Sequence, residues 1–177
     1  MISGKSILLR AYKESDIEES FNLINNLEIL SSLCHGNIFP LSLENQREFI
    51  MKCMKSNEPT FNFAIEEKST GKYIGGCGIN SYDSKNRNVT IGMWLGEKYH
   101  GNGYGSDSLR TLCSFIFNEM NIFKIKLNYF SFNEKGRKCY DSVGFKVEGI
   151  RKNEIFRFGK YHDIIEMALF KEDLILK

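Results

Sequence analysis

The sequence predicts an α/β (α+β) fold in which helices cover both faces of one mixed sheet. The first observation is that strand-like and helix-like segments follow one another in the order β-α-α-β-β-β-α-β-α-β-β. The second is that the 177 residues contain no linker, low-complexity tract or internal repeat. A chain of this length removes roughly 70% of its surface from water on folding, so we expect one domain over residues 1–177.

Two amphipathic helices are predicted after an N-terminal strand at residues 6–13. Asp16 and Glu19 have the spacing of a capping box at the start of the first helix. The apolar face of that helix carries Ile17, Phe21, Ile24 and Leu27. The second helix follows Ser42, and its expected inward-facing residues are Leu43, Ile50, Cys53 and Met54.

The remaining segments alternate between strands and helices. Residues 61–67 and 73–82 are typical of a hairpin, and residues 88–96 alternate apolar and polar side chains as a third strand. The other expected elements are a helix from near Ser106, a strand at 123–130, a short helix at 134–143 and two strands between 145 and 170.

Composition argues against several classes of protein. The 24 basic and 22 acidic residues give a net charge of +2, which does not indicate a polyanion-binding surface. The five cysteines are scattered and never spaced C-x-x-C, so we expect reduced thiols in a cytoplasmic protein, without a disulfide framework or a metal site. The sequence has no apolar signal region and no long apolar run, so we expect neither export nor a membrane partner.

Three glycines at alternate positions precede the central predicted helix, in the segment 100–105 (HGNGYG). Unobstructed backbone N–H groups and the partial positive charge of a helix start favour an anion such as a diphosphate there. The alternative is a turn that only lets strand and helix pack tightly. The spacing of Gly101, Gly103 and Gly105 differs from the dinucleotide fingerprint, and the Gly-Lys-Ser at 4–6 lacks the upstream glycine of a P-loop.

This loop resembles the diphosphate-binding loop of the GNAT superfamily of N-acetyltransferases, whose pattern is Q/R-x-x-G-x-G/A. Residues 133–145 (NEKGRKCYDSVGF) are similar to a second segment of that family, with Asn133, Tyr140, Gly144 and Phe145 in register. The start at 8–24 and the end at 151–174 look like the RimJ/RimL-like branch, which acetylates protein N-termini, polyamines and other small amines. The resemblance spans nearly the whole chain.

Three positions depart from the family pattern. His100 stands where glutamine or arginine is expected, and Gly136 stands where serine is expected. Many relatives carry a glutamate near the position of Thr90 that relays a proton from the amine, and this chain has NVTIG there. Because the diphosphate cradle is mostly backbone, His100 is compatible with it. The general base is unassigned, with Glu66 or Glu67 at a strand end as candidates.

The resemblance implies a mostly antiparallel sheet in which two parallel strands splay apart around the pantetheine arm of acetyl-CoA. Met93, Trp94 and Leu95 would lie on one side of that arm and residues 127–129 on the other. The backbone N–H of Leu95 would face the oxyanion. The residues expected around the diphosphate are His100, Gly101, Asn102, Gly103, Tyr104, Gly105 and Ser106.

The resemblance also implies roles for residues after the splayed strands. Asn133 would hydrogen-bond the pantetheine arm, and Tyr140 would protonate the departing thiolate. Arg137 or Lys138 would face the 3'-phosphate of coenzyme A. Candidate contacts of the amine are His35 and Tyr129.

Several of these positions also have an ordinary structural interpretation. Tyr140 could simply pack beside Cys139, and Asn133 could cap the helix that follows it. The cations of residues 135–138 could form a solvated helix face. His100 could be a loop or capping residue. The sequence leaves both interpretations open at each position.

The implied function is an acetyl-CoA-dependent N-acetyltransferase that acts on a protein N-terminus or a small-molecule amine by direct attack in a ternary complex. The alternative is a non-catalytic acyl-CoA-binding sensor or assembly module, which the missing glutamate favours. Residues 31–42 contain no acidic cluster, which disfavours spermidine as the acceptor. Residues 151–161 interleave cations with aromatics, but the balanced charge favours an exposed hairpin over a nucleic-acid surface. The edge of that hairpin is a candidate for homo-oligomer formation.

Overall fold

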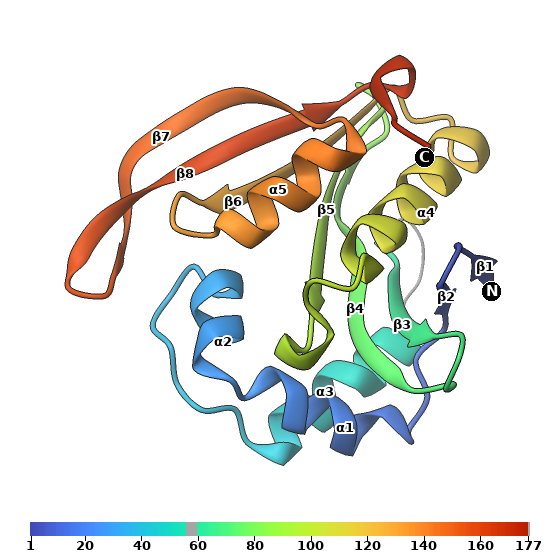
Figure 1. The fold of residues 1–177 in the computed structure, drawn as a ribbon, viewed down its shortest axis with the longest axis vertical. Coiled ribbons are helices and arrows are strands. Elements are labelled where there is room, and N and C mark those ends of the chain that lie inside the picture. The colour runs from blue at the N-terminus through green and yellow to red at the C-terminus, as the bar shows by residue number, and fades with distance from the viewer. Residues whose placement is uncertain (56–59, 177) are drawn as a thin grey trace.

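The computed structural model describes residues 1–55 and 60–176, and its elements follow the predicted alternation (Figure 1). The strands are β1 Ile2–Ser3, β2 Ile7–Arg10, β3 Asn62–Glu67, β4 Tyr73–Asp83, β5 Asn88–Leu95, β6 Lys124–Phe130, β7 Lys146–Arg157 and β8 Lys160–Leu169. The helices are α1 Asp16–Ile24, α2 Leu27–Leu33, α3 Leu43–Met54, α4 Tyr104–Glu119 and α5 Glu134–Val143, with short 3-10 turns at Glu97–Tyr99 and Lys171–Asp173.

The strands form one mixed sheet in the order β1-β2-β3-β4-β5-β6-β8-β7. Among the described strands, β5 and β6 are the parallel pair, and all other neighbours are antiparallel. A parallel pair needs a crossover, and α4 supplies it. The predicted mixed, mostly antiparallel sheet is therefore confirmed.

Helices cover both faces of this sheet, as predicted. Successive side chains of a strand point to opposite faces. On β3, Ile65 packs in the cluster that contains Leu109 of α4, whereas its neighbour Ala64 packs with Ile17 of α1 and Ile50 of α3. The sheet is thus buried between α4 on one face and the α1–α3 layer on the other.

The N-terminal helices differ from the prediction. α1 ends at Ile24, and a separate helix, α2, begins at Leu27, whose side chain is exposed instead of lying on the apolar face of α1. The break occurs because Asn26 caps α2, with its side-chain oxygen accepting from the N–H groups of Glu28 and Ile29. The strand β1 was also not predicted.

Asp16 does not act as a helix cap, contrary to the capping-box prediction. Ser15 is the N-cap of α1, and its side chain makes no capping hydrogen bond. The buried carboxylate of Asp16 instead accepts from Arg10 Nη1 at 2.7 Å and Arg10 Nη2 at 2.8 Å. This bidentate pair joins β2 to α1, and Glu66 of β3 also pairs with Arg10.

Two of the four residues predicted to face inward on α3 are exposed. Ile50 and Cys53 are buried, but Leu43 in the first turn and Met54 in the last turn are about two-fifths exposed. The sheet covers the middle turns of α3, but the two helix ends extend past it. The apolar periodicity of the sequence therefore predicts more burial at the helix ends than the structure shows. The central helix α4 also begins two residues earlier than predicted, at Tyr104.

The parallel strands β5 and β6 are paired at one end only, and this places the site. Their register covers Asn88–Thr90 opposite Lys124–Lys126, although β5 continues to Leu95 and β6 to Phe130. Figure 1 shows β6 turning away from β5 beyond the shared end. The splayed pair implied by the family resemblance is confirmed.

Within the described residues, we find no helix that combines the length and the apolar character needed to cross a membrane.

Candidate active site

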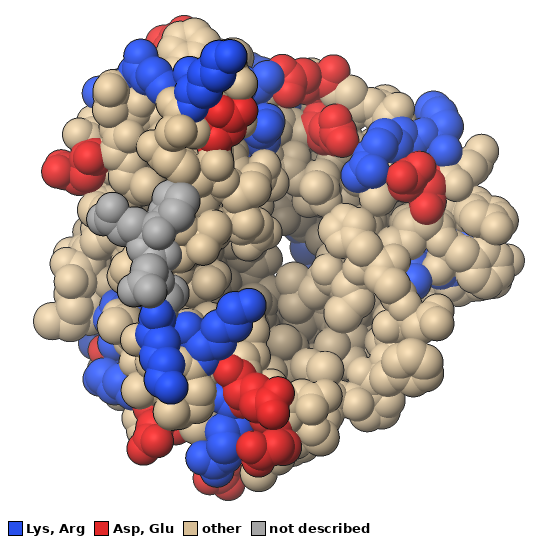
Figure 2. All heavy atoms as spheres, turned by 180° about the vertical axis from the view of Figure 1, so that it is seen from behind, with Lys and Arg blue, Asp and Glu red and all other residues tan. Residues whose placement is uncertain are grey.

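The divergence of β5 and β6 opens a cleft of about 780 Å³. One wall is residues 90–95 of β5 and the other is residues 127–130 of β6, with α2, the glycine-rich loop and α5 around the ends. Figure 2, drawn from the back, shows an opening near the middle of the molecule, surrounded mostly by uncharged side chains. Met93, Trp94 and Leu95 all line the cleft, as does Tyr129 on the opposite wall.

The backbone N–H of Leu95 points toward the cleft, on the edge of β5 from which β6 has diverged. Leu95 lies opposite Gly75 of β4, and the next residue, Gly96, donates its N–H to the carbonyl of Ile74 at 3.0 Å. Because consecutive N–H groups of a strand point in opposite directions, the N–H of Leu95 points away from β4. This donor is therefore available on the cleft side.

The glycine-rich loop leads directly into the first turn of α4. Gly101 and Gly103 have φ of +80°, a left-handed conformation that glycine adopts without steric cost. Gly103 is the N-cap of α4, and the N–H groups of the first helical turn have no intrahelical acceptor. Gly101, Gly103, Gly105 and Ser106 line the cleft. The loop therefore presents unpaired donors and a helix start to the same cavity, which fits a diphosphate.

Gly105, in the first turn of α4, packs closely against its neighbours. A Cβ there would lie 3.2 Å from Cys139 Sγ, which would have to shift by a few tenths of an ångström, and 3.5 Å from Met93 Cε, which is ordinary contact. Side chains of α5 and β5 therefore approach the start of α4. Both interpretations of the glycines, tight packing and an anion cradle, are compatible with this geometry.

The side chains of His100, Asn102 and Tyr104 lie in different surroundings. His100 lines the cleft, where its Nε2 is 3.0 Å from the carbonyl oxygen of Leu95. Its buried Nδ1 has no hydrogen-bond partner among the described residues. Asn102 and Tyr104 are not lining residues, and the Tyr104 hydroxyl donates to Glu67. Contacts from positions 102 and 104 to a ligand in the cleft would therefore come from the backbone.

Asn133 lines the cleft and caps α5 at the same time. Its side-chain oxygen accepts from the N–H of Gly136 at 2.9 Å. A Cβ at position 136 would lie only 2.7 Å from Asn133 Nδ2, so the asparagine side chain would have to move to admit a serine.

Tyr140 of α5 lines the cleft opposite β6. Its ring centroid lies 5.6 Å from that of Tyr129 and 6.3 Å from that of Phe145. Burial raises the pKa of the Tyr140 hydroxyl well above its usual value, and the neighbouring Cys139 and Tyr129 act in the same direction. The phenol therefore stays protonated throughout the physiological pH range, in contact with the cavity.

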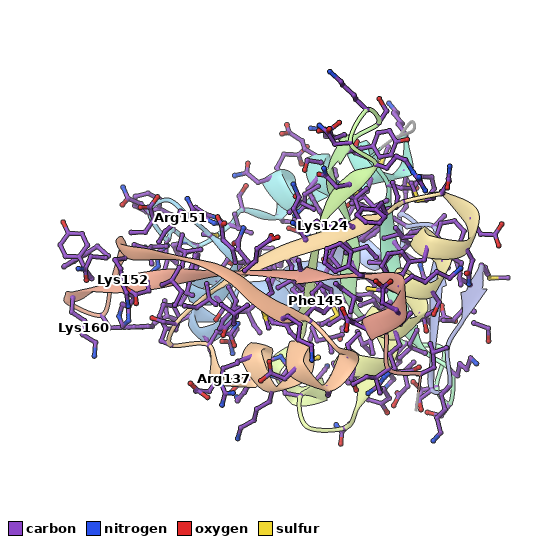
Figure 3. All side chains as sticks on the ribbon, turned by 90° about the horizontal axis from the view of Figure 1, so that it is seen from above. Lys124, Arg137, Phe145, Arg151, Lys152 and Lys160 are labelled. Atoms are coloured by element: carbon purple, nitrogen blue, oxygen red, sulfur yellow. The ribbon has the colours of Figure 1, made fainter. Side chains whose placement is uncertain are left out.

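The basic residues of α5 separate into two groups. Lys135 and Lys138 line the cleft. Arg137 is not a lining residue, because it pairs with Glu134 at 2.9 Å and Asp141 at 3.1 Å along its own helix. Figure 3 shows Arg137 on the outer side of α5. Of Arg137 and Lys138, only Lys138 therefore borders the cleft.

The end of the cleft near α2 contains charged residues that were not identified from the sequence. His35, a predicted amine contact, lines the cleft, with its ring centroid 5.2 Å from that of Phe130. Glu28 and Glu97 also line the cleft. Lys135 Nζ lies 2.7 Å from Glu28 Oε1, and this hydrogen bond lowers the pKa of the carboxyl. No local signal marks these carboxylates, because the fold brings Glu28 and Lys135 together across 107 positions.

The two carboxylates named as candidate bases lie elsewhere. Glu66 pairs with Arg10, and Glu67 accepts from Tyr104 and Thr70. Neither lines the cleft. Thr90, the position where many relatives have glutamate, does line it. In the described part of the chain, no group of three or more His, Cys, Asp or Glu residues could hold a metal ion.

Comparison with known proteins identifies the family. A model described as the acetyltransferase (GNAT) domain matches residues 6–146. The SPbeta prophage-derived uncharacterized N-acetyltransferase YokL of Bacillus subtilis (strain 168) is 29% identical over 176 residues, covering 98% of this chain and 95% of that protein.

Solved structures agree with the fold. Spermidine N-acetyltransferase from Vibrio cholerae, in complex with CoA and spermine, superposes with a TM-score of 0.82 at 23% identity, covering 95% of this chain and 97% of that one. RimL, a ribosomal L7/L12 alpha-N-protein acetyltransferase, superposes with a TM-score of 0.81 at 23% identity, covering 96% of this chain and 92% of that one. The family model spans β2 to α5, including the whole glycine-rich loop and Tyr140. The chain therefore belongs to the GNAT family of acetyltransferases and is an acetyl-CoA-dependent acyltransferase.

Proposed function

We propose that this protein, acting as one domain, transfers the acetyl group of acetyl-CoA to a primary amine by direct attack within a ternary complex. The observation that carries the proposal is the cleft between β5 and β6. The glycine-rich start of α4, the N–H of Leu95 and the hydroxyl-bearing Tyr140 all border this one cavity. An anion site, an oxyanion donor and a proton donor are the three parts that the reaction needs.

In the proposed coenzyme site, the diphosphate lies against the N–H groups of the glycine-rich loop and the start of α4. The pantetheine arm passes between residues 93–95 and 127–129, where Asn133 can hydrogen-bond it. Lys138 is the proposed contact of the 3'-phosphate, since Arg137 is engaged with carboxylates of its own helix. A cleft of about 780 Å³ is large enough for an extended ligand of this kind.

In the proposed reaction, the neutral amine nitrogen forms a bond to the thioester carbonyl carbon. The carbonyl oxygen becomes an oxyanion that the N–H of Leu95 stabilises. The carbon–sulfur bond then breaks, and Tyr140 donates its proton to the thiolate, giving free coenzyme A. The attacking nitrogen releases its proton to solvent to give the amide, and Tyr140 takes a proton back from solvent. Burial raises the pKa of Tyr140, so the phenol still holds its proton when the thiolate departs. No base is assigned for the amine proton.

The acceptor we propose is an amine that arrives as a cation, in a manner similar to the RimJ/RimL-like branch. Glu28 and Glu97 line the same cleft as His35, and Glu28 is paired there with Lys135. Carboxylates in a cleft attract a cationic amine and raise its local concentration. Spermine in the Vibrio cholerae neighbour and a protein α-amine in RimL are both of this class. Residues 31–42 contain no acidic cluster, but both carboxylates lie outside that segment, so a polyamine is compatible with the cleft.

The test is release of free thiol from acetyl-CoA in the presence of an amine panel. The panel contains peptides that begin with Ala or Ser, polyamines, aminoglycosides, amino sugars and free amino acids. We expect rapid release with an amine that is cationic at neutral pH, and no release with neutral amides. Coenzyme A binding without thiol release for any member of the panel would contradict the proposal. The sole tryptophan, Trp94, lines the cleft, so its fluorescence reports coenzyme binding independently of turnover.

A further inference from the structure

Arg157, the last residue of β7, is a buried cation that reaches the segment between α2 and α3. Its side chain is only 9% exposed. Nη2 donates to the carbonyl of Cys34 at 2.5 Å and to the carbonyl of Gly36 at 2.7 Å. These two carbonyls flank His35. Figure 1 shows the tip of the long β7–β8 hairpin extending over this side of the molecule.

The hairpin tip that carries Arg157 is itself well anchored. His162 Nε2 lies 3.1 Å from the carbonyl oxygen of Arg157. The ring of His162 packs against that of Phe132, with 4.9 Å between centroids. Ile155, two residues before Arg157, is buried with Phe130 and Ile164. Arg157 therefore extends from a fixed support to a segment that has little regular structure.

The segment that Arg157 contacts has no regular secondary structure, and its far end is held by the Asn25 side chain, which hydrogen-bonds the backbone of Leu41. Residues 34–42 contain neither helix nor strand. His35 is exposed at the cleft, with its ring edge-on to Phe130. Two hydrogen bonds from one guanidinium on either side of His35 fix the direction of the backbone at that residue. The position of the His35 ring in the cleft thus depends on Arg157.

Stability alone is a poor explanation for this arrangement. Among the described residues, no carboxylate lies within ion-pair distance of Arg157, and its buried Nε has no hydrogen-bond partner. A buried charge without a counter-ion is costly, and apolar side chains of similar volume often replace buried ionic groups without loss of stability. A planar donor that holds two carbonyls at once is a specific way to set loop geometry.

We propose that Arg157 is a positioning residue for the amine acceptor. It acts through the backbone of Cys34 and Gly36 to hold His35 and this side of the cleft in the arrangement that receives the amine. The inference rests on the proposed function, because it assigns the α2 end of the cleft to the acceptor. Arg157 has no role in coenzyme binding, since the coenzyme site lies at the glycine-rich loop.

The experiment compares Arg157→Gln and Arg157→Lys with a control on the same strand, Arg151→Gln. Arg151 lies at the surface of the hairpin (Figure 3). It pairs with Glu154 and Glu166. Steady-state kinetics use spermidine or a peptide that begins with Ser, whichever the wild type acetylates faster. Amide hydrogen exchange of residues 34–39 is measured in the same variants without any substrate.

We expect Arg157→Gln to raise the KM for the amine about tenfold, because it removes one charge-assisted hydrogen-bonded contact. The KM for acetyl-CoA should stay unchanged. Arg157→Lys should recover part of this loss, since an ammonium can reach one carbonyl. Exchange at residues 34–39 should become faster in Arg157→Gln and stay unchanged in Arg151→Gln. If Arg157→Gln does not fold, Arg157→Lys is compared with the wild type instead. We then expect a smaller rise in the KM for the amine.

Three results would overturn the inference. The first is an unchanged KM for the amine in the folded variants, and the second is unchanged exchange at residues 34–39. The third is an equal rise in both KM values, which would mean a general structural role. Failure of the proposed function is distinguishable, because it would be seen in the wild type as absence of acetyl transfer to every amine tested.

Discussion

The imidazole Nε2 of His100 lies 3.0 Å from the carbonyl oxygen of Leu95, which joins the glycine-rich loop to the end of β5. A carbonyl only accepts, so Nε2 carries the proton in this hydrogen bond. Leu95 is also the residue whose N–H points into the cleft. One residue therefore supplies the proposed oxyanion donor from its N–H and anchors the coenzyme loop through its carbonyl.

His100→Ala should raise the KM for acetyl-CoA about fivefold, because one hydrogen bond of about 1 kcal/mol that orders the loop is lost. His100→Gln restores the residue type of the family pattern and keeps an N–H donor, so its KM should stay close to that of the wild type. Initial-rate kinetics with varied acetyl-CoA measure both. Equal KM values for wild type and His100→Ala would mean that the loop keeps its conformation without this contact.

Tyr140→Phe should lower kcat about 100-fold with little change in the KM for acetyl-CoA, because general acid catalysis contributes at least that much. Tyr161→Phe is the control, since Tyr161 is exposed on the hairpin. A kcat for Tyr140→Phe close to that of the wild type would assign the proton donor to another group.

The pH profile gives a second measure of Tyr140. Burial raises its pKa above the usual value, so the acid loses its proton only above pH of about 10. An alkylamine acceptor has a pKa of about 10.4 and becomes more reactive as pH rises. The wild-type kcat should therefore increase or stay level between pH of about 7 and about 10. A fall in kcat within that range would indicate an acid of lower pKa than this tyrosine.

Gly103→Ala should weaken coenzyme A binding about tenfold, because the left-handed conformation costs an alanine about 1–2 kcal/mol and the loop relaxes away from the cradle. Gly159→Ala is a matched control. Gly159 has φ of +77° in the hairpin turn and, like Gly103, has open space where a Cβ would lie. Both variants should lose similar stability, and only Gly103→Ala should lose affinity. Trp94 fluorescence titration measures the affinity; equal affinities of the two variants would exclude position 103 from the coenzyme cradle.

Glu28→Gln and Glu97→Gln should each raise the KM for a cationic amine about threefold to tenfold and leave the KM for acetyl-CoA unchanged. The wild-type KM for the amine should itself rise when the ionic strength increases from about 0.05 M to about 0.5 M, because salt screens the attraction. Glu44→Gln is the control, since Glu44 is exposed on α3. A salt-independent KM would argue against a cationic acceptor at this end of the cleft.

Arg10→Ala should lower the free energy of unfolding by about 3–5 kcal/mol, because it leaves the buried carboxylate of Asp16 without its bidentate partner. The double variant Arg10→Met with Asp16→Leu should be destabilised less than Arg10→Ala, since no buried charge remains at Asp16. Arg47→Ala, which removes an exposed pair with Glu44, should change stability by about 0.5 kcal/mol or less. Urea unfolding measures all three. A double variant less stable than Arg10→Ala would contradict this account.

The sequence by itself determined the mixed sheet, the positions of most elements and the family. Those features follow from local patterns: the alternation in β5, the apolar face of α4 and the glycines between them are each readable within about one turn or strand. The family resemblance implied roles for Tyr140 and Asn133 and placed His100 in the diphosphate loop, and all three residues line the cleft. Local patterns failed at helix ends, as at Leu27 and Asp16, where a cap and an arginine of the preceding strand decide the outcome.

Only the tertiary structure decided which side chains share the cleft. It brought Glu28 beside Lys135 and directed Arg157 to the carbonyls around His35, across separations of more than a hundred residues. It also turned Arg137 to the outside of α5 while Lys138 lines the cavity. The physical reason is that ion pairs and hydrogen bonds between distant segments leave no periodicity in the sequence. They form where the packing of the sheet and its helices brings the segments together.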